Sequence, residues 1–204
     1  MSAFLGPIHY WLYNKIQLQE AWIKDILELS AQKGWPAGSG EKMDSVCGKL
    51  ELLPLEDIID ERNIHGWLHE RIGITETRLA FLVTELLNED STRLTDLRQA
   101  ANQFGKKHAV QKGIGADEVL RIMEDTLLDG MPCDNVNQVL ESGTDKAVWR
   151  KTQCVHREYW EQFGGDAALY DALREDIITG MLIHSDLELS ALGNNEYQIS
   201  RKEQ

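Results

Sequence analysis

The chain has 204 residues and a formal net charge of −13 at pH 7, from 34 acidic and 21 basic residues. This length suffices for a hydrophobic core without staples, and the acidic balance argues against nucleic acid as a partner. No apolar run approaches the roughly 20 residues that span a bilayer, and the N-terminus lacks signal-peptide features. The three cysteines form no C-x-x-C motif. The sequence therefore predicts a reduced, cytoplasmic protein with no membrane partner.

Apolar residues at helical spacing predict helices along the whole chain. The first begins at Pro7, where a missing N–H costs nothing, and ends before Gly34. A connection containing Gly and Pro follows at 34–54, and the section at about 75–142 is predicted as further helices. The fold class predicted is all-α, with 1–204 as a single domain: an antiparallel helical bundle of about four long helices, with extra helices inserted in the middle. The four long helices are expected at about 7–33, 55–72, 145–163 and 166–192.

A short motif occurs twice, at 56–69 and at 175–188. Both copies begin Glu-Asp-Ile-Ile and continue to an Ile-His pair, so that His65 aligns with His184. The same register aligns His69 with Glu188. Residues four apart on a helix share one face, so each copy is expected to present a histidine with a second metal-capable side chain.

These side chains are the predicted metal site. Glu61 lies one turn before His65, and His9 adds an imidazole from the first helix. Facing helices of a bundle can converge imidazoles and carboxylates on one ion, either iron or zinc. Two imidazoles could also hold a haem, which is less favoured and would be dissociable, because no C-x-x-C-H motif is present. The predicted ligands are His65, His69, His184, Glu188, His9 and Glu61.

The ligand spacings resemble those of the hemerythrin-like proteins, whose antiparallel four-helix bundle holds two irons. That family uses a lone His, an H-x-x-x-E, an H-x-x-x-H and an H-x-x-x-x-D/E. The matching residues here are His9, His184 with Glu188, His65 with His69, and His156 with Glu161. The order along the chain differs from the family's. If 145–163 and 166–192 are antiparallel helices, His156 and His184 are separated by roughly 15 Å along their axes. The resemblance implies a bundle with a metal centre.

Three functions are open on this basis. The first is a metal or metal-cofactor protein for sensing or storing a small ligand such as dioxygen, or for redox chemistry. The second is a non-enzymatic interaction or regulatory module, with a protein partner or a second copy of the chain, whose histidines only hydrogen-bond in the core. The third is a thiol- or carboxylate-based enzyme around Cys133, Glu20 and His156. No P-loop, dinucleotide fingerprint, H-E-x-x-H motif or nucleophile elbow occurs in the chain.

Overall fold

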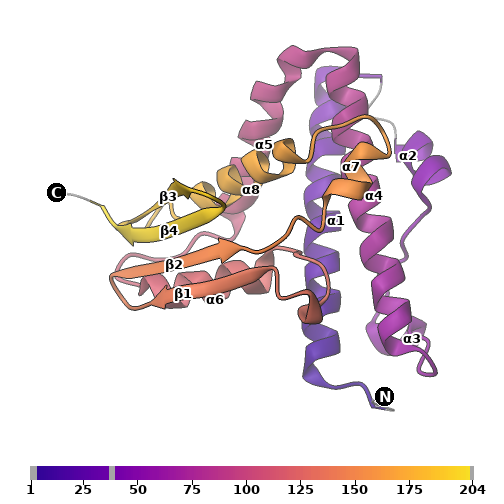
Figure 1. Cartoon of the computed structure of the whole chain (residues 1–204). Helices are drawn as coiled ribbons and strands as arrows, with labels where there is room; N and C mark the ends of the chain where they lie inside the picture. Colours follow the sequence, from indigo (N-terminus) through magenta and orange to yellow (C-terminus); the bar gives the residue numbers. More distant parts are fainter. Residues whose placement is uncertain (1–3, 37–39, 203–204) are drawn as a thin grey trace.

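The computed structural model describes residues 4–36 and 40–202 and has a mixed α/β fold (Figure 1). Two of the predictions fall partly outside the described residues. The N-terminus that lacks signal-peptide features includes residues 1–3, and the predicted connection at 34–54 includes residues 37–39. The helices are α1 (Pro7–Lys33), α2 (Gly40–Cys47), α3 (Leu55–Ile58), α4 (Ile64–Glu89), α5 (Leu94–Lys107), α6 (Ala116–Thr126), α7 (Arg157–Glu161) and α8 (Ala167–Met181), with short 3₁₀ turns at Ser91–Arg93 and Pro132–Asp134. The strands are β1 (Asn137–Ser142), β2 (Lys146–Lys151), β3 (Leu187–Gly193) and β4 (Glu196–Arg201).

The all-α bundle prediction is wrong, because the C-terminal third contains a four-stranded antiparallel sheet in the order β1-β2-β4-β3. The predicted helix 145–163 is β2 followed by the short α7, and the predicted helix 166–192 is α8 followed by β3. Leu187 and Leu189 alternate with polar neighbours, which is the period of a strand. Asn194 and Asn195, both with positive φ, form the turn between β3 and β4.

Two long helices, α1 and α4, form the other half of the molecule. The bounds of α1 agree with the prediction, and its C-cap Gly34 adopts φ +68°. The predicted helix 55–72 is instead split into α3 and the start of α4, where the Asn63 side chain caps the Gly66 N–H. Helix α4 then continues through Gly73, past the predicted end at residue 72, because a glycine inside a helix costs only about 1 kcal/mol.

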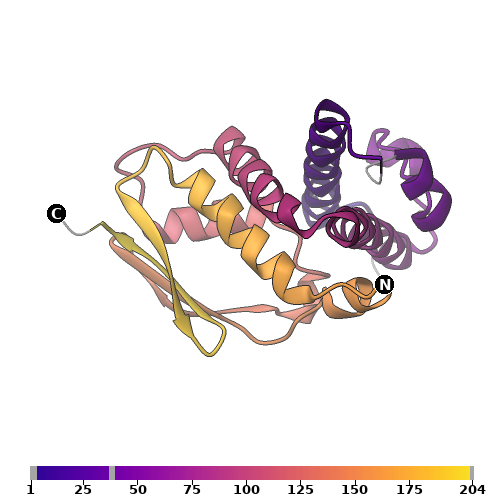
Figure 2. The ribbon, with the colours of Figure 1, turned by 90° about the horizontal axis from the view of Figure 1, so that it is seen from above.

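Helices α5 and α8 pack closely against each other, and α8 is the one nearer to the sheet (Figure 2). Two glycines permit this approach. A Cβ at Gly105 would collide with the backbone of Ile177, and a Cβ at Gly180 would collide with the backbone of Asn102. Helix α6 contacts β2 and β4. The middle section at about 75–142, predicted as helical, is helical through α6 but ends in β1. Within the described chain, no helix is long and apolar enough to cross a membrane.

The hydrophobic core consists of two clusters with a polar layer between them. The larger cluster joins the second halves of α1 and α4 to α5, α6, α8 and the sheet. The smaller cluster joins the first halves of α1 and α4 to α3. Between the clusters, α1 contributes Gln19 and Glu20, and α4 contributes Thr75, Glu76 and Arg78, all of them buried. Buried charges of this kind are rare unless they are paired, and such groups are common at functional sites.

Candidate functional site

Two of the predicted ligands, His9 and His65, come together near the start of α1 and α4. Their Nε2 atoms are 3.4 Å apart, and the Gly6 N–H donates to His9 Nδ1 at 2.9 Å. His9 is buried, whereas His65 is exposed. Glu61 is exposed in the turn before α4, and His69 borders a separate cavity of about 260 Å³ that also contains Glu76. The motif at 56–69 therefore gathers one histidine pair rather than a four-ligand face.

The other two predicted ligands lie elsewhere. Helix α8 ends at Met181, so His184 lies in the following turn and Glu188 on β3, and both side chains are exposed. The expected helical i, i+4 relation between them does not exist. His184 and Glu188 belong to the half of the molecule that carries the sheet. His65 lies in the first turn of α4, in the other half (Figure 1). Among residues 4–36 and 40–202, no group of three or more His, Cys, Asp or Glu side chains could hold a metal ion.

His156 is the histidine on which buried charges converge. Its ring is 0 % exposed at the N-cap of α7. The Nδ1 atom lies 2.9 Å from Glu76 Oε2 on α4, and the Nε2 atom lies 3.6 Å from Asp129 Oδ1 in the loop after α6. The ring of Tyr170 stacks on the imidazole with a centroid separation of 3.6 Å. The imidazole is thus held between two carboxylates and beneath an aromatic ring.

The charge of His156 follows from this arrangement. Burial alone would lower the pKa of the imidazole, but the carboxylates of Glu76 and Asp129 outweigh burial and raise the pKa to about 9. The ring is therefore an imidazolium at neutral pH. Because it is fully enclosed, it is suited to holding Glu76 and Asp129 in position rather than to contacting a substrate.

Asp129 is the acceptor that joins this network to two further elements. Its Oδ2 accepts a hydrogen bond from Arg174 on α8 at 3.0 Å and one from the Asn137 side chain at 2.9 Å. Burial would raise the pKa of Asp129, but the Arg174 guanidinium opposes burial and holds the pKa well below its usual range. The carboxylate is therefore ionised and anchored. Four buried atoms here have no hydrogen-bond partner among the described residues: Asp129 Oδ1, His156 Nε2, Arg174 Nε and Asn137 Oδ1.

A second group of charges extends the polar layer along α1 and α4. Arg78 contacts Glu20 at 3.1 Å and Asp44 of α2 at 2.5 Å, and the Thr75 hydroxyl donates to Glu20 at 2.7 Å. All of these side chains are paired, so the group has the character of a structural clamp. Cys133 is exposed and makes no contact with Glu20 or His156 in the described structure, so the residues of the predicted thiol or carboxylate site are not assembled.

A cavity of about 190 Å³ opens on the α1 side of Asp129. Lys15 enters it from α1 and Glu124 from α6, and Asp129 and Asn137 belong to its wall. Its less polar lining consists of Trp11, Met131, Pro132 and Val136.

Lys15 distinguishes this cavity from the others. The residue is only 4 % exposed, and its Nζ lies 4.2 Å from the centroid of the Trp11 ring. Lys15 makes no hydrogen bond or ion pair with any residue that the structure describes. The Trp11 indole is itself fixed, because its Nε1–H donates to Asp125 Oδ1 at 2.7 Å. A buried ammonium group is therefore held against an aromatic face without an acceptor.

Burial shifts the two titratable side chains of the cavity in opposite directions. It lowers the pKa of Lys15 to about 8, even though Asp129 and Glu124 favour the charged amine. It also raises the pKa of Glu124. An amine with a lowered pKa thus shares the cavity with a carboxyl group whose pKa is raised, and shifts in these directions suit general acid–base or nucleophilic chemistry.

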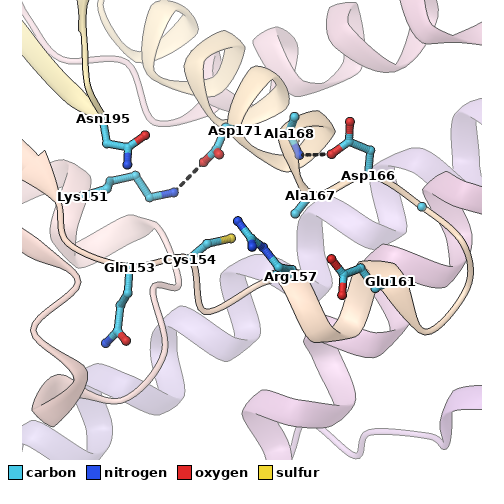
Figure 3. A pocket seen from close by; sticks show the side chains of 11 residues that line it. Lys151, Gln153, Cys154, Arg157, Glu161, Asp166, Ala167, Ala168, Asp171 and Asn195 are labelled. Carbon is cyan, nitrogen blue, oxygen red and sulfur yellow. Dashed lines mark hydrogen bonds and ion pairs between the residues drawn. The ribbon is translucent and has the colours of Figure 1, made fainter.

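A larger cavity, of about 540 Å³, lies between the β2–α7 connection and the start of α8 (Figure 3). Cys154 and Arg157 both point into it, and Lys151 donates to Asp171 Oδ1 at 2.5 Å (Figure 3). The N-terminus of α8 is already capped by Asp166. The buried cation of this cavity, Lys151, is paired, and Arg157 is exposed. Size alone therefore does not make this cavity the better candidate.

Sequence reasoning missed the site around Lys15, although one signal was present. Lys15 occurs between Leu12 and Gln19 on the buried face of α1, where a surface lysine is not expected. The charged groups around the cavity gave no comparable signal, because Asp129 and Arg174 lie far from Lys15 in the chain. No family model matches the chain, and neither the search of curated proteins nor that of solved structures finds a match.

Proposed function

We propose that this protein binds a small polar organic molecule in the Lys15 cavity and presents to it an amine that can act as a base or a nucleophile. One observation carries the proposal: the Lys15 side chain is buried, faces a cavity, and has no hydrogen-bond or ion-pair partner in the described structure. Lysines are almost never buried without a partner, because desolvating the ammonium group is costly. A function is the simplest reason for keeping a lysine at a position of α1 that packing alone would fill with an apolar residue.

The dimensions and lining of the cavity define the ligand class. A volume of about 190 Å³ is smaller than the roughly 300–1,000 Å³ of typical ligand pockets, so the ligand is small. The wall combines the Trp11 face with a few polar groups, as ligand sites commonly do. Glu124 and Asp129 oppose the binding of an anion, so the ligand is uncharged or carries a hydrogen-bond donor.

The buried charge network supports this site from behind. Asp129 belongs both to the cavity wall and to the cluster of His156 and Arg174. Because these cations hold the Asp129 carboxylate in one position, the wall opposite Lys15 is rigid. Preorganisation of this kind lowers the entropic cost of binding.

Binding is testable with a panel of small neutral alcohols, amines and carbonyl compounds at millimolar concentration. The readout is the Trp11 indole N–H signal in a spectrum of ¹⁵N-labelled protein, assigned with Trp11→Phe. We expect at least one class of compound to shift this signal and to lose the effect in Lys15→Met. Lys24→Met is the matched control, since Lys24 is on the same helix but is exposed and, among the described residues, is paired only with Glu28.

Two outcomes contradict the proposal. One is that no compound of the panel shifts the Trp11 signal. The other is that the shifts persist in Lys15→Met, or occur instead at His69 or Arg157, which border two other cavities. Either result places the ligand site elsewhere or removes it.

Metal binding, the function first expected from the sequence, has less support in the geometry. The His9–His65 pair is the only part of the predicted ligand set that the described structure brings together. His9 accepts the Gly6 N–H through Nδ1, so a neutral His9 carries its proton on Nε2, where a metal would need a lone pair. The metal function and the interaction-module alternative stay predictions. Titration with Zn²⁺ or Fe²⁺ while the His65 ring signals are followed tests the former.

A further inference from the structure

We propose that Lys15 forms an imine with a small, uncharged aldehyde or ketone bound against Trp11. This inference rests on the proposed function and specifies its substrate class. The geometry points to covalent chemistry because the amine is enclosed, faces an open volume, and has no acceptor with which to form an ion pair. An ammonium group that served only structure would be expected to contact one of the carboxylates of the same cavity.

The alternative is that the Lys15 ammonium binds an anionic ligand as a point charge. The charges around Lys15 argue against it. Glu124 and Asp129 border the same 190 Å³ cavity, and Asp125 adds a further negative charge close by. A carboxylate or phosphate ligand would be repelled by these groups, whereas a neutral carbonyl compound would not. The aldehyde or ketone carbon would lie next to the amine, with its apolar part on the Trp11 ring.

The reaction is balanced within the cavity. The Glu124 carboxylate first takes a proton from the Lys15 ammonium group. The neutral amine then attacks the carbonyl carbon, a C–N bond forms, and the carbonyl oxygen takes that proton from the Glu124 carboxyl group. The nitrogen of this adduct then returns a proton to the Glu124 carboxylate. Glu124 next protonates the hydroxyl group, which leaves as water while the C=N bond forms. The net change is ammonium group plus carbonyl compound to iminium plus water, with Glu124 again a carboxylate and no oxidant or reductant required.

Asp129 has a positioning role in this scheme. The protonated imine is a cation, and the Asp129 carboxylate is held ionised in the same cavity by Arg174 and His156. A fixed negative charge stabilises a developing positive charge without having to reorganise. The electrostatic environment that disfavours an anionic ligand thus favours the iminium product.

The experiment uses the full chain at pH 8 with glycolaldehyde, propanal or hydroxyacetone, in the presence of cyanoborohydride. This reagent reduces an iminium to a stable secondary amine, which peptide mass spectrometry then locates. We expect Lys15 to be modified roughly tenfold faster than the exposed Lys24 in the folded protein, because the lowered pKa of Lys15 gives this amine a larger neutral fraction than an ordinary lysine has. In urea-unfolded protein the two lysines should react at similar rates. Glu124→Gln should slow modification of Lys15 and leave that of Lys24 unchanged.

The outcomes separate this inference from the proposed function. If the carbonyl compounds shift the Trp11 indole signal but Lys15 is modified no faster than Lys24, the imine is excluded and the binding site stands. If neither the Trp11 shift nor the adduct appears with any of the three compounds, the imine is likewise excluded, and the panel of alcohols and amines decides the binding function. Selective modification of Lys15 that persists in unfolded protein would also overturn the inference, since it would not depend on the cavity.

Discussion

The histidine pair His9–His65 and the enclosed His156 show how differently the same side chain is used in two regions of this molecule. In the pair, two histidines meet at 3.4 Å near the start of two helices, and His65 is exposed to solvent. In the second region, His156 is fully enclosed between Glu76 and Asp129 and takes its charge from them. The pair contains two of the residues that the sequence pattern singled out as metal ligands. The enclosed network is the region that supports a cavity with a reactive side chain, because it fixes one of the cavity walls.

The largest expected effect is on the free energy of unfolding, and it distinguishes the loss of a buried ion pair from the loss of an exposed one. Arg174→Met removes the guanidinium that neutralises Asp129 and leaves a buried carboxylate short of a partner, so we expect a loss of about 3–5 kcal/mol in the free energy of unfolding. The control, Arg98→Met, removes an exposed pair with Asp176 and should cost no more than about 1 kcal/mol. Urea denaturation measures both. Equal losses would mean that the network is not the stability-determining region.

His156→Gln tests whether His156 is charged, because the charge makes the free energy of unfolding depend on pH. The pKa of His156 is raised to about 9 from 6.5, so its stabilisation is fully present below about pH 6.5 and is lost as pH rises through 9. At full strength this difference corresponds to about 3 kcal/mol. Unfolding free energies at pH 6, 7 and 8 should therefore fall in the wild type and fall less in His156→Gln. Above pH 8, deprotonation of Lys15 in the folded state acts in the opposite sense, so the comparison is made below that pH.

Identical pH dependence in the two proteins would contradict the assignment of His156 as a buried imidazolium. A His9→Gln variant serves as the control, since its histidine belongs to the other region. Its pH dependence between 6 and 8 should follow that of the wild type more closely than His156→Gln does.

Lys15→Met tests whether the cavity lysine serves function rather than folding. Removing a desolvated ammonium group and keeping a side chain of similar shape should leave stability at pH 7 unchanged or raise it by about 1–3 kcal/mol. Ligand shifts of the Trp11 signal should disappear in the same protein. Lys24→Met should change stability by no more than about 0.5 kcal/mol. A clear destabilisation by Lys15→Met would show that the lysine has a structural role.

The smallest expected effect belongs to the region that the sequence pattern emphasised. His65→Gln removes one partially exposed hydrogen bond and should cost no more than about 1 kcal/mol. The Trp11 ligand shifts should be unaffected. If His65→Gln abolished those shifts, or destabilised the protein more than His156→Gln does, the contrast between the two regions would be reversed.

Signals between neighbouring residues predicted the ends of some helices in this fold. The sheet, which pairs strands far apart in the chain, was not predicted. Pro7 and Gly34 mark the ends of α1, and Asp166 caps α8, where its side chain accepts the Ala168 N–H. The sheet was missed because the apolar spacing of α8 continues into Leu187, so that a helix period was extended across a turn and a strand. The Asn194-Asn195 pair was the available signal of a hairpin.

The candidate site was less predictable than the fold. Its side chains come from α1, α6 and the loop before β1, with support from α4, α7 and α8. No spacing rule links Lys15 to Asp129, because their proximity results from packing of the whole chain. The one local indication, a lysine on the buried face of α1, concerns burial rather than a motif. A search for charged residues on apolar helix faces would have found it.

Titration of the Lys15 amine tests the central claim most directly. The signal of its Cε methylene can be followed in ¹³C-labelled protein and assigned from its absence in Lys15→Met. We expect a pKa of about 8, with a change in the titration when a small carbonyl compound is bound. A Lys15 pKa near the ordinary lysine value of about 10.4, unaffected by every compound of the panel, would show that this amine is neither desolvated nor at a binding site.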